Sequence, residues 1–159
     1  MGLLYANVFP TIMGRKAVDV ARKMVQLSID NNLWITNLQL QKILYFTWID
    51  YYKAGHGRLF EDQKFEAWKY GPVVDKVYYE YWLNVSRLIL FTKEPEEDMS
   101  DVSDFLLDSL RKYQPKKASE LVDMAHEEGS PWAECYKEGK KEEIPFSLIE
   151  KSVLIGSGC

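Results

Sequence analysis

One helix constrains the fold of this chain more than any other segment. Thr36 and Gln39 have the spacing of a capping box, in which each side chain bonds the other's backbone N–H, so a helix is expected to begin at Asn37. Apolar side chains then occupy almost every face of the helix: Leu38, Leu40, Ile43, Leu44, Tyr45, Phe46, Trp48, Ile49, Tyr51 and Tyr52. A helix that is apolar all round is buried. The sequence therefore predicts a domain built around a central helix over residues 37–54.

Helical periodicity extends over most of the remaining chain. Apolar residues recur every three or four positions, the pattern of an amphipathic helix, in six further stretches: residues 14–31, 74–85, 102–113, 118–127, 131–136 and 146–153. Gly71-Pro72 is expected to open the second of these helices. Pro72 would then lie in the first turn, where its missing N–H has no consequence.

Two short segments depart from this helical pattern. Residues 63–70 alternate between aromatic and polar side chains, which is typical of a strand. Residues 87–91 are an apolar run that forms either a second strand or the last turn of the preceding helix. The predicted fold class is therefore mainly α: a compact helical single domain with a small β-hairpin or extended ribbon around residues 63–70 and 87–91.

The length of 159 residues fits one domain with a sizeable core, which we expect over residues 14–155. Residues 1–13 are expected to be an N-terminal arm: a flexible segment, a partner-binding extension or sequence added for expression. Residues 156–159, Gly-Ser-Gly-Cys, are expected to be a frayed tail that need not be native. No apolar run reaches the roughly 20 residues of a membrane-spanning helix. Two cysteines without C-x-x-C spacing are typical of a reduced, cytoplasmic protein.

Residues that could carry catalysis are sparse. The sequence lacks the P-loop, the glycine-rich dinucleotide pattern and the HExxH and GxSxG motifs, and two histidines with two separated cysteines do not suggest a zinc site. His126 could be a general base, but at a predicted helix end it is better explained as a capping or packing residue. Nothing in the sequence activates Cys135 as a nucleophile beside His126. We therefore predict no enzymatic activity, no catalytic residue, no metal and no cofactor.

Charge is distributed unevenly along the chain. The net charge of −4 disfavours nucleic acid as a ligand. Arg15, Lys16 and Arg22 make the first predicted helix basic, whereas acidic residues gather between Glu94 and Asp108. The acidic cluster is either a set of solvated helix faces and a loop, or a patch that matches a basic partner.

Lys42 lies within the otherwise apolar central helix. Its amine either reaches solvent while its methylene stem covers the core, or forms a polar pair with Gln41 on a binding face. The first interpretation is favoured, because a buried lysine would need a partner.

Aromatic residues are in excess between residues 70 and 82. The inward stripe of the predicted helix consists of Val74, Val77, Tyr78, Tyr81 and Trp82. Tyr70 and Tyr79 are then left near the surface, beside Lys69 and Lys76. Tyrosine anchors protein interfaces because it offers a large contact area with few rotors. We predict that Gln41, Lys69, Tyr70, Lys76 and Tyr79 bind a partner. The alternative is a second small core under residues 63–70.

Three blocks of the sequence together resemble the Panacea domain, a family first described as phage-associated GepA-like proteins. The blocks are TNLQLQKILYF at residues 36–46, EAWKYGPVV at 66–74 and AHEEGSPW at 125–132. The residues that carry the match are Leu38, Leu40, Gln41, Lys42, Tyr45, Ala67, Trp68, Gly71, Pro72, Val73, His126, Pro131 and Trp132. The resemblance covers roughly residues 17–152, and most of these residues are expected to maintain the fold.

The resemblance implies a protein whose ligand is another protein. Panacea domains include antitoxins that neutralise a toxin by direct contact and SocA-type adaptors that deliver a toxin to a Clp-type protease. We therefore expect an antitoxin of a bacterial or phage toxin–antitoxin system, bound to a cognate toxin. The alternatives are a SocA-like proteolytic adaptor and a DNA-binding autoregulator. Self-association is left open.

Overall fold

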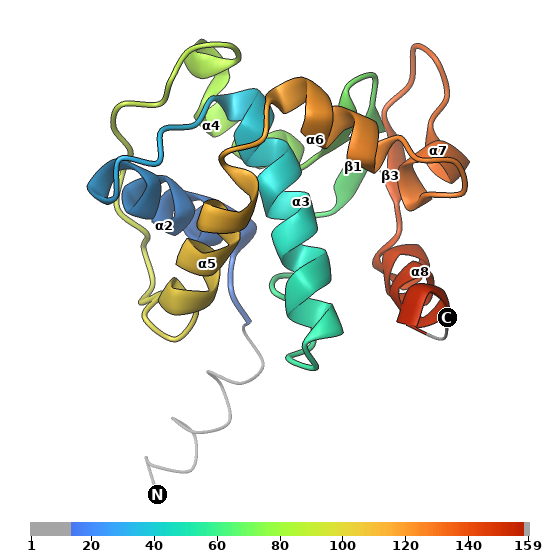
Figure 1. The fold of residues 1–159 in the computed structure, drawn as a ribbon, viewed down its shortest axis with the longest axis horizontal. Coiled ribbons are helices and arrows are strands. Elements are labelled where there is room, and N and C mark those ends of the chain that lie inside the picture. The colour runs from blue at the N-terminus through green and yellow to red at the C-terminus, as the bar shows by residue number, and fades with distance from the viewer. Residues whose placement is uncertain (1–13, 158–159) are drawn as a thin grey trace, which may run out of the picture.

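The computed structural model describes residues 14–157 (Figure 1). The elements in chain order are α2 (Ala17–Asp30), α3 (Asn37–Lys53), β1 (Phe65–Trp68), β2 (Gly71–Val73), α4 (Asp75–Glu80), the 3-10 helix η1 (Trp82–Asn84), α5 (Ser103–Tyr113), α6 (Ala118–Ala125), α7 (Pro131–Cys135), β3 (Glu142–Ile144) and α8 (Phe146–Ser157). The predicted mainly α fold is confirmed. The expected arm, residues 1–13, lies outside the described residues, and α8 includes the first two residues of the expected tail.

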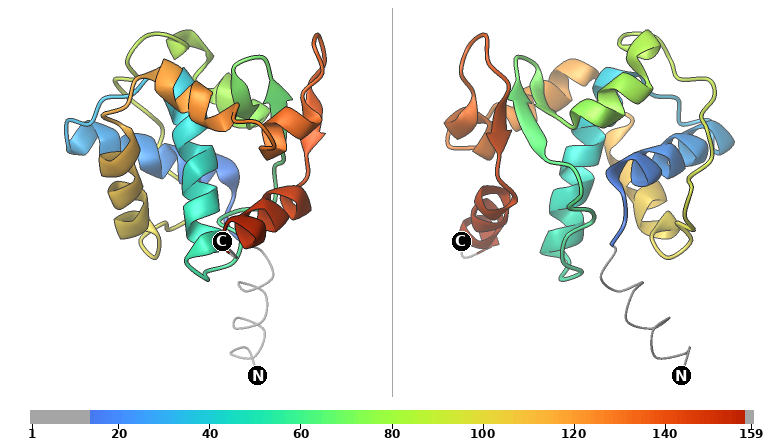
Figure 2. Two further views of the ribbon diagram at one scale, coloured as in Figure 1. Left: turned by 45° about the vertical axis from the view of Figure 1, so that its right-hand side comes forward. Right: turned by 180° about the vertical axis from the view of Figure 1, so that it is seen from behind.

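Helix α3 begins where the sequence predicts and lies in the middle of the domain. The N–H of Gln39 donates to Thr36 Oγ1 at 3.2 Å, and the N–H of Thr36 donates to Gln39 Oε1 at 3.0 Å, which completes the capping box. Figures 1 and 2 show α2 and α5 on one side of α3, and the sheet with α8 on the other. Because these elements surround α3, the helix is apolar on almost every face.

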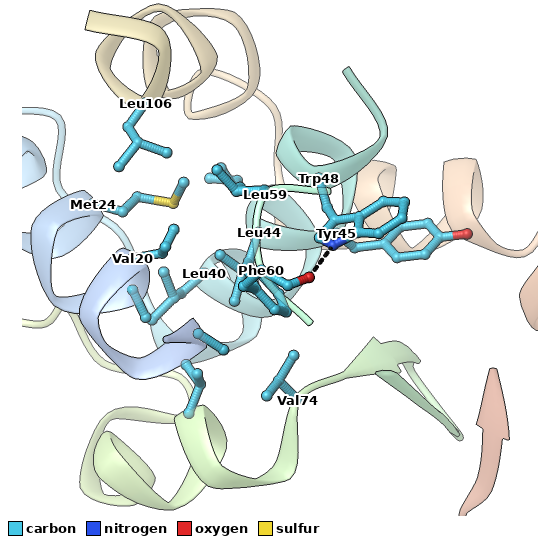
Figure 3. Packing of buried hydrophobic residues seen from close by; sticks show 14 of the residues in the cluster. Val20, Met24, Leu40, Leu44, Tyr45, Trp48, Leu59, Phe60, Val74 and Leu106 are labelled. Atoms are coloured by element: carbon cyan, nitrogen blue, oxygen red, sulfur yellow. Dashed lines mark hydrogen bonds between the residues drawn. The ribbon is translucent and has the colours of Figure 1, made fainter. Parts of the chain in front are cut away.

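The hydrophobic core forms where α3 meets α2, α5 and the segment between α3 and β1. Figure 3 shows its members, among them Val20, Met24, Leu40, Leu44, Leu59, Val74 and Leu106. Trp48 is fully buried on the side of α3 that faces α8, where it stacks on Phe146 with 5.1 Å between ring centroids. Its Nε1 donates to the carbonyl oxygen of Phe60 at 2.9 Å. Because that indole N–H has a partner, the tryptophan can be buried without the cost of an unpaired donor.

The strand predicted within residues 63–70 is confirmed as β1, but its partners differ from the prediction. β1 is the central strand of an antiparallel sheet with the order β2-β1-β3, in which Trp68 pairs with Gly71 and Phe65 pairs with Ile144. Residues 87–91 are not part of this sheet, because Leu88 makes an isolated bridge to Thr36 instead. A strand pattern in the sequence indicates an extended segment, and the partner of that segment depends on where the helices place it.

Pro72 lies in a strand, and the prediction that it opens a helix is wrong. Gly71 has a φ of +106°, which lets the chain turn back along β1. Pro72 follows as the middle residue of β2, an edge strand of the sheet, where a missing N–H is tolerated. The helix predicted over residues 74–85 is also shorter: α4 begins at Asp75 and ends at Glu80, and the 3-10 helix η1 follows.

Lys42 contradicts both interpretations of the sequence, because it is neither at the surface nor on a binding face. Its side chain is fully buried, and its Nζ donates to the carbonyl oxygen of Pro72 at 3.1 Å. A Cβ on residue 71 would lie 2.7 Å from Lys42 Cε, so Gly71 leaves the space that the lysine stem fills. Burial lowers the pKa of Lys42 from its ordinary 10.5 to about 7.

The burial of Lys42 predicts an unusual pH dependence of stability. Between about pH 7 and 10.5 the unfolded lysine binds a proton that the folded amine does not, so the free energy of unfolding should rise with pH across this range. Lys42 should contribute up to about 1.4 kcal/mol per pH unit to this rise in the free energy of unfolding. Below pH 7 the amine is protonated in both states, so Lys42 no longer makes the free energy of unfolding depend on pH. Urea unfolding at three pH values between 7 and 9 measures it.

Lys42→Met should lack this rise, whereas Lys53→Met, which removes an exposed lysine near the end of α3, should keep it. The difference between the two variants isolates Lys42 from the tyrosine and cysteine groups that also titrate at high pH. Parallel pH curves for the wild type and Lys42→Met would contradict the prediction.

Candidate protein-binding surface

Large apolar side chains are exposed together over α4, η1 and the loop that follows. They are Tyr79, Trp82, Leu83 and Phe91, and we call this set the apolar face. Phe91 is 83% exposed and Trp82 is 60% exposed. All four residues line one shallow pocket of about 310 Å³, so they adjoin one another in space. Because contiguous exposed apolar patches mark interaction sites, the apolar face is a candidate protein-binding surface.

The 3-10 helix η1 turns Trp82 toward solvent. Val77 is buried and Tyr81 is only 5% exposed, as the predicted inward stripe requires. The chain then leaves α-helical geometry at Tyr81, where φ is −120° and ψ is 30°. A 3-10 helix has three residues per turn and so changes the direction of the next side chains. The prediction that Trp82 faces inward is therefore wrong, and this local change of helix type creates part of the apolar face.

A row of polar side chains on α3 holds the segment beneath the apolar face. Asn37 Nδ2 donates to the carbonyl oxygens of Tyr78 at 3.0 Å and Tyr81 at 3.1 Å. Gln41 Oε1 accepts from the N–H of Val74 at 3.1 Å, and Gln41 Nε2 donates to Asn37 Oδ1 at 2.9 Å. Together with the bond from Lys42 to Pro72, these contacts form what we call the polar ladder: Asn37, Gln41 and Lys42. The ladder attaches β2 and α4 to the central helix.

Further contacts hold the end of α4 and the loop that follows η1. Arg22 of α2 donates to Glu80 Oε2 at 2.6 Å, and this bond raises the pKa of the Arg22 guanidinium. Beyond η1, the N–H of Ile89 donates to the carbonyl oxygen of Ile35 at 2.9 Å. The hydroxyl of Tyr81 also bonds that of Thr92. These bonds hold the backbone that carries the apolar side chains in one conformation. Less conformational entropy would therefore be lost when a partner binds.

The residues predicted to bind a partner are only partly brought together. Tyr79 and Lys76 are exposed on α4, and Lys69 and Tyr70 are exposed at the turn between β1 and β2. Gln41 is a correction: it is 1% exposed and belongs to the polar ladder, because its amide satisfies backbone and side-chain groups inside the domain.

Sequence reasoning missed the residues that dominate the exposed apolar surface. These are Trp82, Leu83, Leu88, Leu90 and Phe91. One signal was available, because the run from Leu88 to Phe91 is too apolar for a loop, yet only Ile89 of that run is buried. The run is anchored by one inward side chain and presents the others to solvent.

Most of the thirteen residues that carry the Panacea-like match lie inside the domain. The buried ones are Leu40, Gln41, Lys42, Tyr45, Ala67, Gly71, Pro72, Val73, Pro131 and Trp132. Trp68 is half-buried, and its ring contacts that of Tyr78 at 5.0 Å. This small aromatic contact beside β1 fits the alternative of a second small core in this region. The other alternative, an interface, stays a prediction.

His126 follows the last residue of α6, where the sequence predicts a capping or packing residue, and its ring stacks on Trp132 with 3.6 Å between ring centroids. Burial and the nearby Lys42 lower the pKa of the imidazole. Burial and neighbouring carboxylates, first that of Glu134, raise the pKa of the Cys135 thiol, which is the reverse of what a nucleophile needs. Within residues 14–157, no group of three potential ligands could hold a metal ion, and no helix is long and apolar enough to span a membrane.

The sequence of this chain is similar to that of known proteins. The family model described as "Antitoxin SocA-like, Panacea domain" matches residues 40–133, which include the polar ladder from Gln41 onward, both strands of the hairpin and the apolar face. Antitoxin SocA from Caulobacter vibrioides (strain NA1000 / CB15N) is 30% identical over 148 residues, covering 77% of this chain and 73% of that protein. No solved structure matches the chain significantly.

The polar ladder predicts a local effect of Asn37→Ala. The substitution leaves the carbonyl oxygens of Tyr78 and Tyr81 without this donor, which should cost about 2 kcal/mol in the free energy of unfolding. Amide hydrogen exchange should accelerate first in residues 75–85. Asn31→Ala, which removes an exposed bond to Leu27, is the control and should change stability by less than about 0.5 kcal/mol. Exchange that accelerates equally along the whole chain would argue against a local role for Asn37.

Proposed function

Because this chain belongs to the SocA-like Panacea domain family of antitoxins, we propose that it neutralises a cognate toxin protein by binding it directly through the apolar face. The observation that carries this proposal is the group of exposed aromatic and aliphatic side chains on α4, η1 and the following loop. Tryptophan and tyrosine are enriched among the residues that contribute most binding energy at protein interfaces. In the apolar face, Tyr79 and Trp82 adjoin one another on a backbone that hydrogen bonds hold in place.

The chemistry of the surface favours a binding role over a catalytic one. The apolar face offers side chains that can insert into pockets of a partner, and its polar neighbours Glu80, Asn84 and Lys93 can form a rim. The two residues that could be combined as base and nucleophile, His126 and Cys135, have a lowered and a raised pKa respectively. We therefore propose that stoichiometric complex formation, and not turnover, is the activity of the protein.

A proteolytic adaptor is the second candidate, because an adaptor must bind two proteins and the chain exposes apolar residues at a second place. Leu154 and Ile155 of α8 are 64% and 63% exposed, and Ile155 lines a separate pocket of about 300 Å³ with Pro131 and Leu148. This surface lies on α8, which Figure 1 shows well apart from α4. A Clp-type protease bound there would leave the apolar face available for a toxin.

Co-expression of the chain with the product of its neighbouring gene tests the proposal. If the neighbour arrests growth alone, and the pair restores growth and co-purifies in equal amounts, the sequestering antitoxin is supported. The same rescue should occur in a host that lacks Clp proteases. Rescue that is lost in this host would support the adaptor instead, and a harmless neighbour that does not co-purify would contradict both.

Variants of the apolar face should separate binding from folding. Trp82→Ala and Phe91→Ala remove exposed side chains, so the midpoint of thermal unfolding should change little, while affinity for the toxin should fall about 30-fold or more, equivalent to about 2 kcal/mol. Leu83→Ala and Leu154→Ala form a matched pair, because the two leucines are 69% and 64% exposed. Only Leu83→Ala should weaken toxin binding, as measured by calorimetry. Equal affinity for both members of the pair would place the interface elsewhere.

A further inference from the structure

Another surface, separate from the apolar face and from the surface on α8, has a different chemistry. We call it the lysine pocket, and its lining includes Trp68, Lys69, Tyr136, Glu138, Lys140 and Lys141. Its volume is about 480 Å³. Three of these residues are lysines and one is a glutamate, in a chain whose net charge is −4. The lining of the pocket therefore has an excess of positive charge, opposite in sign to the net charge of the protein.

The aromatic walls of the lysine pocket are held by one buried residue. Trp132 donates its Nε1 hydrogen to the carbonyl oxygen of Trp68 at 2.7 Å. Its ring stacks on Tyr136 with 4.5 Å between centroids, and the N–H of Tyr136 donates to its carbonyl oxygen at 2.8 Å. The two walls belong to the hairpin and to the loop after α7, and Trp132 joins them. The pocket is therefore formed before a ligand arrives.

Lys141 shows how the pocket uses its aromatic rings. Its Nζ lies 4.0 Å from the centroid of Trp68, in the geometry of a cation–π contact. The contact positions an ammonium group in the pocket wall and covers that face of the indole. That face of the indole cannot stack on a nucleic-acid base, and the lysines add positive charge to the pocket.

We propose that the lysine pocket binds an acidic peptide segment of the partner protein. Carboxylates would pair with the ammonium groups of Lys69, Lys140 and Lys141, while the methylene groups of glutamate side chains would pack on Tyr136 and the open part of Trp68. The pocket lining contains no arginine, whose planar fork suits phosphate, and lysine acts as a point charge that carboxylates satisfy equally well. This inference rests on the proposed function, because it describes the chemistry of the toxin surface.

The lysine pocket is continuous with the apolar face through a row of rings. Trp68 contacts Tyr78 at 5.0 Å between centroids, and Tyr78 contacts Tyr79 at 5.5 Å. The right-hand view of Figure 2 shows α4 beside the β1–β2 hairpin. Tyr70 extends this surface at the turn of the hairpin, and its ring centroid lies 5.5 Å from Lys69 Nζ. A single partner can thus place an apolar anchor on the apolar face and an acidic segment in the lysine pocket.

The charge reversal Lys140→Glu/Lys141→Glu tests this inference against the control Lys53→Glu/Lys151→Glu, which changes net charge equally at exposed sites on α3 and α8. Stopped-flow mixing with the purified toxin measures the association rate constant. We expect the first variant to lower it about tenfold at low salt and the control to change it by less than twofold. The difference should disappear near 0.5 M NaCl, where screening is nearly complete. Equal rate constants for the two variants would overturn the lysine pocket while leaving the antitoxin proposal intact.

A synthetic decaglutamate peptide gives a readout that does not depend on the toxin. Fluorescence anisotropy should show that the wild type and Lys53→Glu/Lys151→Glu bind the labelled peptide, and that Lys140→Glu/Lys141→Glu does not. If no toxin co-purifies with the wild type, the proposed function fails, and this measurement alone decides whether the pocket takes acidic peptides. Equal binding by all three proteins, or tighter binding of a ten-nucleotide thymidine strand than of decaglutamate, would overturn the inference.

Discussion

The hydrogen bonds between α3 and the segment that follows β1 are the interaction on which the rest of the structure depends. Asn37, Gln41 and Lys42 stand on one helix that is otherwise packed in apolar surroundings, and each bonds the backbone of residues 72–81. Buried polar groups are costly unless they are paired, so these three side chains are satisfied only when β2 and α4 lie where the structure has them. Polar groups in the core thereby specify a position that apolar packing alone would leave variable.

This attachment explains how a small domain can present exposed aromatic residues without unfolding around them. α4 has six residues and η1 three, and elements so short have little stability of their own. Their inward residues Val77 and Tyr81 and the polar ladder hold the backbone, which leaves Tyr79 and Trp82 free to face solvent. The lysine pocket is arranged in the same way, since Trp132 holds both of its walls from below. Both proposed binding surfaces thus depend on buried side chains that a partner would never touch.

Local signals predicted much of this fold. The capping box at Thr36 and Gln39 and the apolar faces of the central helix were correct because they depend on neighbours in sequence. The prediction failed where two distant segments meet. Lys42 was assigned to the surface because a lone lysine in water is best solvated there, and only the Pro72 carbonyl, 30 residues away, provides the alternative. Gln41 was assigned to a binding face as the neighbour of Lys42. The change from α-helix to 3-10 helix after Tyr81 had no sequence signal that we could use.

The sequence by itself determined the fold class, the central helix, the exposure of Lys69, Tyr70, Lys76 and Tyr79, and the family, because periodicity, capping and short motifs are encoded within a few residues of one another. The tertiary structure decided which strands pair, which polar residues are buried and which apolar residues remain outside. The physical reason is that a side chain is buried only when another segment of the chain packs against it. Trp82 and Lys42 have the same neighbours in sequence whether they are buried or exposed. The place of each depends on what another part of the chain brings against it.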